Sequence, residues 1–180
     1  MEFIADNDSI PNSGSGQELD TTPQSQEAEA ALLGVLLYDN EVYHKVSPIV
    51  QAKHFYNPVH VRIFDAIARL IETGKLADAI VLKNRFSQDE TLVDIGGEQY
   101  LAELLLHAPS GAAAPEYAKM IFDLAMRREL IRLGGEISQT ASNPDSDMDA
   151  QQQITEAEGQ LYGLAEIGAV QGGFDSFKTA

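Results

Sequence analysis

The sequence contains no cysteine and no tryptophan, and its 12 basic residues are outnumbered by 28 acidic ones. The absence of cysteine excludes disulfides, thiolate metal sites and cysteine nucleophiles, and it fits a reducing cytoplasm. The longest apolar run, residues 30–38, is well short of the roughly 18 residues that a membrane-spanning helix needs. The first residues are acidic, whereas a secretory signal starts with a basic segment. We therefore expect a cytoplasmic protein with no membrane span.

The acidic residues are unevenly distributed along a chain whose formal net charge is −16. Residues 1–26 and residues 139–160 each contain five acidic residues and no basic one, while the segment between them is mildly acidic. Nucleic-acid binding depends on Lys and Arg side chains that displace counterions from phosphates. The composition therefore predicts a protein partner and no direct binding to nucleic acid.

The beginning of the chain predicts a disordered segment followed by two helices. Residues 1–22 are rich in Ser, Asp, Asn, Gln and Gly, a composition typical of a disordered tail. Helical spacing of apolar residues then begins after Ser25, a good N-cap residue, and continues to Tyr38. Asn40 is predicted to cap a second, short helix that ends near Pro48.

The next helix has the clearest end signals in the sequence. Asn57 stands at the predicted cap, Pro58 at the first helical position, and Gly74 just past the end. Shorter helices are predicted after Asp78 and after Gly97. No segment alternates polar and apolar residues as a half-buried strand would, so no strand is predicted.

Two long helices are predicted in the last third of the chain. The first runs from Pro115 to about Ala141, and at 1.5 Å per residue it is roughly 40 Å long, more than a small domain can cover. After a turn at residues 143–145, apolar residues recur at spacings of three and four, typical of a coiled-coil seam. We expect a protruding hairpin that mediates self-association through Leu124, Ile131, Leu161 and Leu164.

The predicted fold class is therefore all-α: a compact helical bundle followed by a protruding antiparallel helical hairpin, with a disordered N-terminal tail. The predicted domains are the acidic tail (residues 1–22), a globular helical subdomain (23–114), the helical hairpin (115–168) and the start of a linker (169–180).

Residue patterns that indicate catalysis are missing. No G-x-x-x-x-G-K-[ST] phosphate-binding loop occurs, and no G-x-S-x-G nucleophile elbow. None of the four histidines belongs to an H-E-x-x-H motif, and the closest pair, His54 and His60, straddles a helix start, which disfavours a shared metal. We interpret His60 as a partly buried packing residue. We expect no catalytic, cofactor-binding or metal-binding residue in the chain.

The charged residues of the helices have simpler interpretations than a site. Glu27 and Glu29 lie in the first turn of a helix, so we interpret them as solvent-exposed partners of the helix dipole. Arg127, Arg128 and Arg132 are interspersed with acidic residues on the long helix, which favours local ion pairs along it.

An ordered series of short segments resembles one known family. The series is Pro23–Glu29, Leu33-Gly34, Asp39-Asn40, His54-Phe55-Tyr56, His60, Ile63-Phe64, Ile95-Gly96-Gly97, Tyr100–Leu104, Ala108-Pro109-Ser110, Tyr117-Ala118 and Arg128–Ile131. It is similar to the N-terminal domain of bacterial replicative DNA helicases of the DnaB family, over about residues 23–168. Leu76-Ala77-Asp78 departs from the family, which usually has a proline two residues before this aspartate, and Val81 stands where threonine is common.

The resemblance implies a role in assembly and docking. Domains of this family form a collar of paired subunits on a hexamer and bind primase, while a separate C-terminal domain, reached through a linker, contains the motor that uses ATP and Mg. It implies that the chain is a fragment without that motor, that it dimerises, and that the parent works in the bacterial replisome with a helicase loader as a further partner. On this resemblance the primase-docking residues are expected to be Glu27, Tyr100 and Glu103.

Three alternatives remain open at the level of sequence. The helicase-binding C-terminal domain of a primase has a similar helical fold, although Met1 and the terminal linker favour the helicase. A stand-alone helical adaptor and a small acidic enzyme with an unrecognised carboxylate site are the others.

Overall fold

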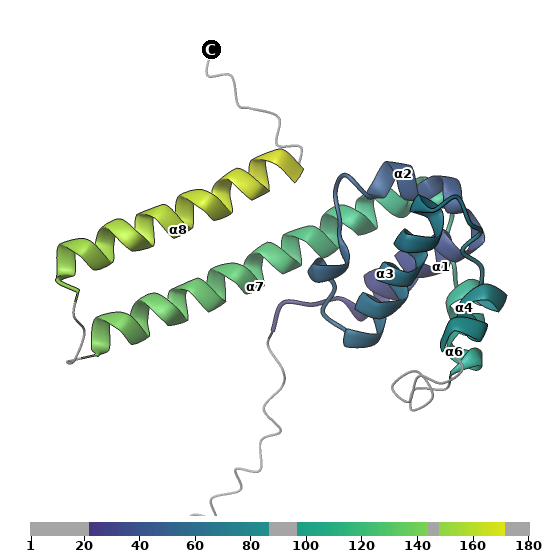
Figure 1. Ribbon diagram of the computed structural model, residues 1–180, viewed down its shortest axis with the longest axis horizontal. Helices are drawn as coiled ribbons and strands as arrows, with labels where there is room; N and C mark the ends of the chain where they lie inside the picture. The colour runs from purple at the N-terminus through teal and green to yellow at the C-terminus, as the bar shows by residue number, and fades with distance from the viewer. Residues whose placement is uncertain (1–21, 87–96, 144–147, 172–180) are drawn as a thin grey trace, which may run out of the picture.

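The computed structural model describes residues 22–86, 97–143 and 148–171. Within these ranges every regular element is helical, which confirms the all-α fold class (Figure 1). The elements are α1 (Gln26–Tyr38), η1 (Asn40–Val42), α2 (Tyr43–Val46), η2 (Ala52–His54), α3 (Pro58–Glu72), α4 (Ala79–Phe86), α6 (Glu98–Leu106), η3 (Gly111–Ala113), α7 (Ala114–Ser142) and α8 (Ala150–Gln171), where η denotes a short 3-10 helix. None of these helices is long and apolar enough to cross a membrane.

Helix α1 forms the centre of the globular body. Ser25 caps it as predicted, because its Oγ accepts a hydrogen bond from the Ala28 N–H at 3.2 Å. Every residue from 32 to 37 is buried, so this part of α1 is enclosed on all sides. A helix that is apolar all round needs neighbours on every face. Helices α3, α6 and the first half of α7 supply them.

Helices α1 and α6 are in close contact at Gly34. A Cβ atom at this position would lie 2.1 Å from the carbonyl oxygen of Leu104, far inside van der Waals contact. Leu101 and Leu104 of α6 are buried at this interface. Glycine at position 34 therefore sets how closely α6 packs onto the central helix.

Helix α3 begins and ends where the sequence predicts. Asn57 Oδ1 accepts a hydrogen bond from the Val59 N–H at 2.9 Å, and Pro58 occupies the first turn. At the other end Gly74 has a φ of +70°, a backbone conformation that favours glycine. The face of α3 turned to the core contains Val59, His60, Ile63, Phe64, Ala66, Ile67 and Leu70.

Asn40 does not cap a helix, so that prediction was wrong. The cap of η1 is Asp39, whose Oδ1 accepts from the Glu41 N–H at 3.0 Å. The Asn40 amide instead donates to the carbonyls of Leu36 and Ala77 and accepts from the Ala77 N–H at 2.8 Å. Asn40 thus fastens the segment before α4 to the end of α1, a long-range role that local pattern cannot show.

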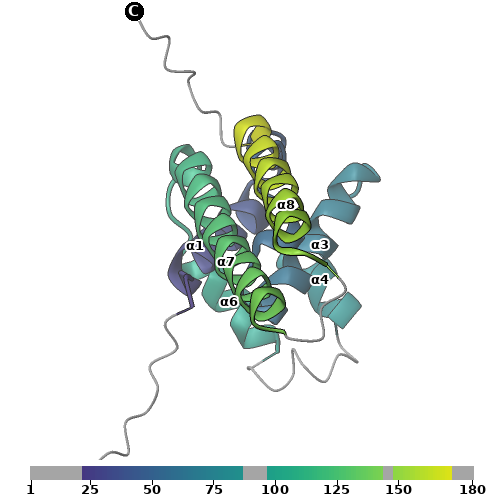
Figure 2. The same cartoon turned by 90° about the vertical axis from the view of Figure 1, so that its left-hand side faces the viewer.

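Helices α7 and α8 form the hairpin. Figures 1 and 2 show α7 leaving the globular body and α8 returning antiparallel beside it. Residues of α7 are buried from Ala114 to Ala125 where it packs on the body, and Leu133 is buried further out. None of the described side chains of α8 is buried. The predicted turn at residues 143–145 lies outside the described residues after Asn143, as do the predicted tail before Thr22 and the linker after residue 171.

Candidate functional site

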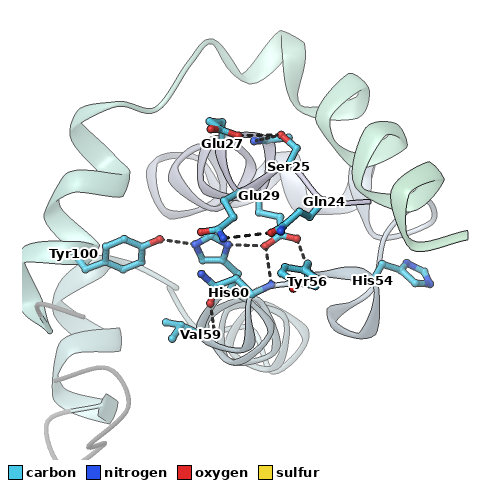
Figure 3. Close-up of polar contacts among 12 residues, drawn as sticks. Gln24, Ser25, Glu27, Glu29, His54, Tyr56, Val59, His60 and Tyr100 are labelled. Atoms are coloured by element: carbon cyan, nitrogen blue, oxygen red, sulfur yellow. Dashed lines mark hydrogen bonds and ion pairs between the residues drawn. The ribbon is translucent and has the colours of Figure 1, made fainter. Parts of the chain in front are cut away.

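A buried polar network joins α1 and α6, the two helices that carry the predicted docking residues, to α3. Glu29 on α1 and His60 on α3 are 2% and 1% exposed. Glu29 Oε1 accepts from the Tyr56 N–H at 2.6 Å, while Oε2 accepts from the Asn57 N–H at 3.2 Å. His60 Nδ1 lies 2.7 Å from Glu29 Oε2, and its Nε2 is hydrogen-bonded to the Tyr100 hydroxyl of α6 (Figure 3).

One protonation state satisfies this network. Burial raises the pKa of Tyr100, and the nearby charges of Glu29 and Glu103 raise it further, so the phenol keeps its proton. When the imidazole is neutral with its proton on Nδ1, the Tyr100 hydroxyl donates to Nε2 of His60, and the Nδ1–H group donates to Glu29. Each of the three side chains has a partner in this arrangement, as buried polar groups require.

The network stabilises helix packing and corrects two interpretations made from sequence. Glu29 is not a solvent-exposed partner of the helix dipole: its carboxylate is buried against the two N–H groups that precede α3. His60 is not partly buried packing: it is enclosed and hydrogen-bonded on both ring nitrogens. A histidine and a carboxylate in this position hold α1, α3 and α6 in one arrangement.

The predicted docking residues lie around this network but in different settings. Glu27 and Glu103 are exposed carboxylates on α1 and α6, two helices packed against each other. Tyr100 is half-buried, and its hydroxyl points inward to His60, with the two rings nearly parallel and their centroids 6.0 Å apart. Only part of the Tyr100 ring is therefore available to a partner.

Arg128 departs from the ion pairs predicted along α7. Its Nη1 donates to the carbonyl of Pro23 at 2.8 Å and its Nη2 to the carbonyl of His54 at 2.6 Å. Its guanidinium also lies 5.6 Å from the ring centre of Tyr56. Arg128 thus ties α7 to the two segments that lead into α1 and α3.

The other two arginines form the predicted local pairs. Arg127 pairs with Asp123 at 2.7 Å, and Arg132 pairs with Glu129 at 2.9 Å and Glu136 at 2.5 Å. All of these side chains are exposed, so each pair contributes little to stability.

An apolar groove of about 530 Å³ runs between α7 and the second half of α8. Its largest apolar residues on α7 are Phe122, Met126 and Leu130, and those on α8 are Leu161 and Leu164. Leu161 is 44% exposed and Leu130 is 50% exposed, so the hairpin alone does not cover the groove. A similar groove of about 510 Å³ near the hairpin tip is lined by apolar residues that include Ile137, Met148, Ile154 and Ala157.

The four predicted self-association residues fall on two surfaces. Leu161 and Leu164 line the apolar groove together. At 100° per residue, Leu124 and Ile131 lie about 160° and 140° around α7 from Met126, which lines the groove. Leu124 is half-buried and Ile131 is 62% exposed. The structure therefore places these two residues on the face of α7 turned away from α8.

The described residues contain no group of three His, Asp or Glu side chains arranged as metal ligands. The polar and apolar features of the described residues are those of helix packing and of uncovered apolar surface.

Comparison with known proteins identifies the family of the chain. A family model described as "DnaB-like helicase N terminal domain" matches residues 21–123, more than half of the sequence. The chain belongs to this family. The replicative DNA helicase DnaB of Rickettsia felis is 38% identical over 143 residues, which are 79% of this chain and 29% of that protein. The DnaB of Treponema pallidum is 35% identical over 121 residues, or 67% of this chain and 28% of that protein.

A solved structure shares the fold. The crystal structure of the N-terminal domain of DnaB helicase from Mycobacterium tuberculosis matches with a TM-score of 0.69 and 27% identity, covering 79% of this chain and 99% of that one. The resemblance read from the sequence is thereby confirmed. The chain spans about three tenths of the length of the curated relatives it matches. A match of 143 residues cannot fit within residues 1–123, so the similarity extends into the hairpin of this DnaB-like domain.

Two structural features of the DnaB-like domain were missed from sequence. The partnership of Glu29 with His60 had a usable signal, because a histidine on the buried stripe of an amphipathic helix needs a hydrogen-bond partner. The signal for Arg128 is weaker. Nothing in its local sequence separates it from Arg127, and only the fold brings the carbonyls of Pro23 and His54 to its guanidinium.

Proposed function

We propose that this chain is the N-terminal collar domain of a hexameric replicative DNA helicase, which pairs subunits and docks primase. The observation that carries the proposal is the uncovered apolar groove of the hairpin, on a chain that belongs to the DnaB-like N-terminal domain family. None of the described side chains of α8 is buried, although Leu161 and Leu164 face the groove.

Pairing of two subunits covers the apolar groove that a single hairpin leaves exposed. Each leucine that becomes buried contributes about 1.5–3 kcal/mol, so covering Leu130, Leu161 and Leu164 with apolar surface of a second copy favours association. Exposed apolar grooves of this kind mark interaction sites. The fragment is then a dimer, and the parent protein is a hexamer built from such pairs.

Primase docks on the surface formed by α1 and α6, which we name the α1–α6 face and define by Glu27, Tyr100 and Glu103. The two carboxylates are exposed, so they can form polar contacts with a partner. The accessible part of the Tyr100 ring offers the partner an apolar contact. The buried network fixes this ring, because the Tyr100 hydroxyl is held by His60. A rigid aromatic residue beside charged groups is a combination found at interface hot spots.

The remaining activities of the parent belong to parts of it that this chain does not cover. We place the ATP-driven unwinding motor, with its ATP and Mg, in those parts. The chain itself contributes no enzymatic step and no direct contact with nucleic acid, in line with its net charge of −16. It acts in the cytoplasmic replisome, where a helicase loader is a further partner.

Calorimetric titration of the 180-residue chain with primase from the same organism tests the docking role. Wild-type protein binds saturably, Glu103→Lys loses at least tenfold in affinity, and Glu27→Lys loses less. Glu158→Lys on α8, an exposed residue, makes the same charge change away from the α1–α6 face and keeps the wild-type affinity.

Three results would contradict the docking role. Absence of binding by the folded wild-type chain would favour a stand-alone adaptor. Equal affinities for wild type, Glu27→Lys and Glu103→Lys, with unchanged circular dichroism, would exclude the α1–α6 face. A loss confined to Glu158→Lys would place primase on the hairpin instead.

A further inference from the structure

The apolar groove between α7 and α8 has one end next to the globular body. Because the two helices are antiparallel, Phe122 of α7 and Gly168 of α8 line the groove at this end, and Leu130 and Leu161 line it toward the hairpin tip (Figure 1). We call the part at Phe122 and Gly168 the body end of the groove. The last turn of α8 therefore finishes beside an apolar surface.

The body end of the groove is not covered by the hairpin itself. A Cβ atom at Gly168 would have no neighbouring heavy atom within 4 Å, so α7 does not pack over this part of α8. Ala165, which also lines the groove, is exposed. The charged residues of this end, Lys119 and Asp123, form ion pairs with other residues of α7. The surface that is left for an occupant is apolar.

A segment with two phenylalanines follows α8 directly. Helix α8 ends at Gln171, and residues 172–180, which lie outside the described residues, contain Phe174 and Phe177. The segment contains one acidic and one basic residue, whereas residues 1–21 contain five acidic residues and no basic one. Because burial of an unpaired charge is costly, an apolar groove favours the neutral aromatic segment over the acidic one.

Two glycines stand where the chain leaves α8. Glycine is the residue most often found just past a helix end, where it turns the chain back over the last helical turn. In this arrangement the residue after the glycine packs against a residue one turn earlier in the helix. With the turn at Gly172-Gly173, Phe174 is that residue, and it packs against Gly168 or Ala169. Phe174 is thereby directed to the body end of the groove.

We propose that residues 172–180 fold back at Gly172-Gly173 and place Phe174 in the body end of the groove of their own chain. At about 3.3 Å per residue, Phe177 lies within roughly 20 Å of the end of α8, so it reaches further along the groove toward Met126 and Leu164. The segment competes with a second copy for the same apolar surface, and in this respect the inference rests on the proposed function.

Methyl NMR tests the contact in the 180-residue chain, with carbon-13 at the methyl groups of its four methionines. Met126 lines the groove and Met120 does not. The ring current of a nearby phenylalanine displaces a methyl resonance, so in Phe174→Ser and Phe177→Ser the Met126 resonance should move and lose contacts to ring protons. The Met120 resonance should stay in place. Phe3→Ser, the matched control in residues 1–21, should leave both resonances unchanged.

Sedimentation equilibrium measures the competition with pairing. A groove that is occupied by its own chain must be cleared before a second copy can bind, which lowers the apparent affinity by the fraction of chains with a free groove. The double variant Phe174→Ser with Phe177→Ser should therefore pair about tenfold more tightly than the wild type. Phe3→Ser should pair with the affinity of the wild type.

Three results would overturn the proposal. One is a Met126 resonance that is the same in wild type and in the double variant. Another is return of the wild-type Met126 resonance when unlabelled wild-type chain is added to labelled Phe174→Ser, because the segment would then bind the second copy. The third is pairing of the double variant that is no tighter than that of the wild type. If neither protein pairs at all, the proposed function fails, and the Met126 resonance still decides whether the segment occupies the groove.

Discussion

Replacing His60 by phenylalanine tests the buried network at its central residue. Phenylalanine fills a similar volume but removes both ring nitrogens. The Glu29 carboxylate, 2% exposed, keeps its two backbone donors and loses its side-chain partner, while the Tyr100 hydroxyl loses its acceptor. Leaving a buried polar group without its partner costs about 1–3 kcal/mol, and more for a charged group, so the two losses together come to about 3–5 kcal/mol. Whole domains are stable by about 5–15 kcal/mol, so His60→Phe removes a large fraction of the stability.

Urea unfolding followed by far-UV circular dichroism measures this loss, at one fixed protein concentration because association would add to the apparent stability. Tyr100→Phe keeps the Glu29–His60 pair and should cost about 1–2 kcal/mol. His107→Phe alters an exposed histidine and serves as the matched control, with a change within about 0.5 kcal/mol. The double variant Glu29→Gln with His60→Phe should lose less than the sum of the single variants, because the two side chains act as one pair.

Unfolding of His60→Phe at the same urea concentration as His107→Phe would show that the buried network does not stabilise the fold. Strict additivity of the Glu29 and His60 variants would also contradict this role, since independent side chains cannot form the central pair of the network.

Two further predictions follow from the packing of α1 and the burial of His54. Gly34→Ala should destabilise the chain by about 3 kcal/mol, because the new methyl group would overlap the Leu104 carbonyl, whereas Gly135→Ala, with open space around it, should be neutral or stabilising in the same urea assay. The pKa of His54 is lowered to about 4 from its ordinary 6.5. Between pH 4 and pH 6.5 the unfolded chain therefore binds a proton at this residue and the folded chain does not. The contribution of His54 to stability is then complete above pH 6.5 and falls as the pH drops toward 4. Between pH 7 and 5 the free energy of unfolding of the wild type should fall by about 2 kcal/mol more than that of His54→Asn. Parallel pH profiles of the two proteins would show that His54 titrates normally.

The parts of the fold that the sequence predicts are those with local signals. Asn57, Pro58 and Gly74 mark the ends of α3 through capping, a fixed φ and a left-handed φ, all of which are properties of single residues. Ser25 marks the start of α1 in the same way. Such positions need no knowledge of distant segments.

The predictions that were wrong concern residues whose contacts are set by segments far away in the sequence. Glu27 and Glu29 look equivalent in the sequence, yet α3 begins beside Glu29 and leaves Glu27 in solvent. Asn40 can cap a helix as well as Asp39 can. Its side chain instead forms hydrogen bonds with the backbone of Ala77, 37 residues away.

For a related reason, the four residues predicted for self-association do not share one surface of the hairpin, and their role in self-association stays a prediction. Helix α7 has apolar residues on several faces because its first half also covers the body. The sequence does not show which of these faces meets α8. The structure assigns Met126 and Leu130 to the groove and leaves Ile131 on another side of the helix.

The pairing of two copies through the hairpin is tested most directly by the mass of the chain in solution. Sedimentation equilibrium of the wild-type chain over a range of concentrations should give twice the mass of 19.6 kDa. Leu161→Asp places a charge in the apolar groove of both copies, removes about 3–6 kcal/mol of burial from the pair, and should weaken association at least a hundredfold while helicity is unchanged. Tyr162→Asp, an exposed neighbour that does not line the groove, should remain a dimer. A wild-type chain of 19.6 kDa at every concentration, or a Leu161→Asp chain that unfolds or stays dimeric, would contradict this role for the hairpin.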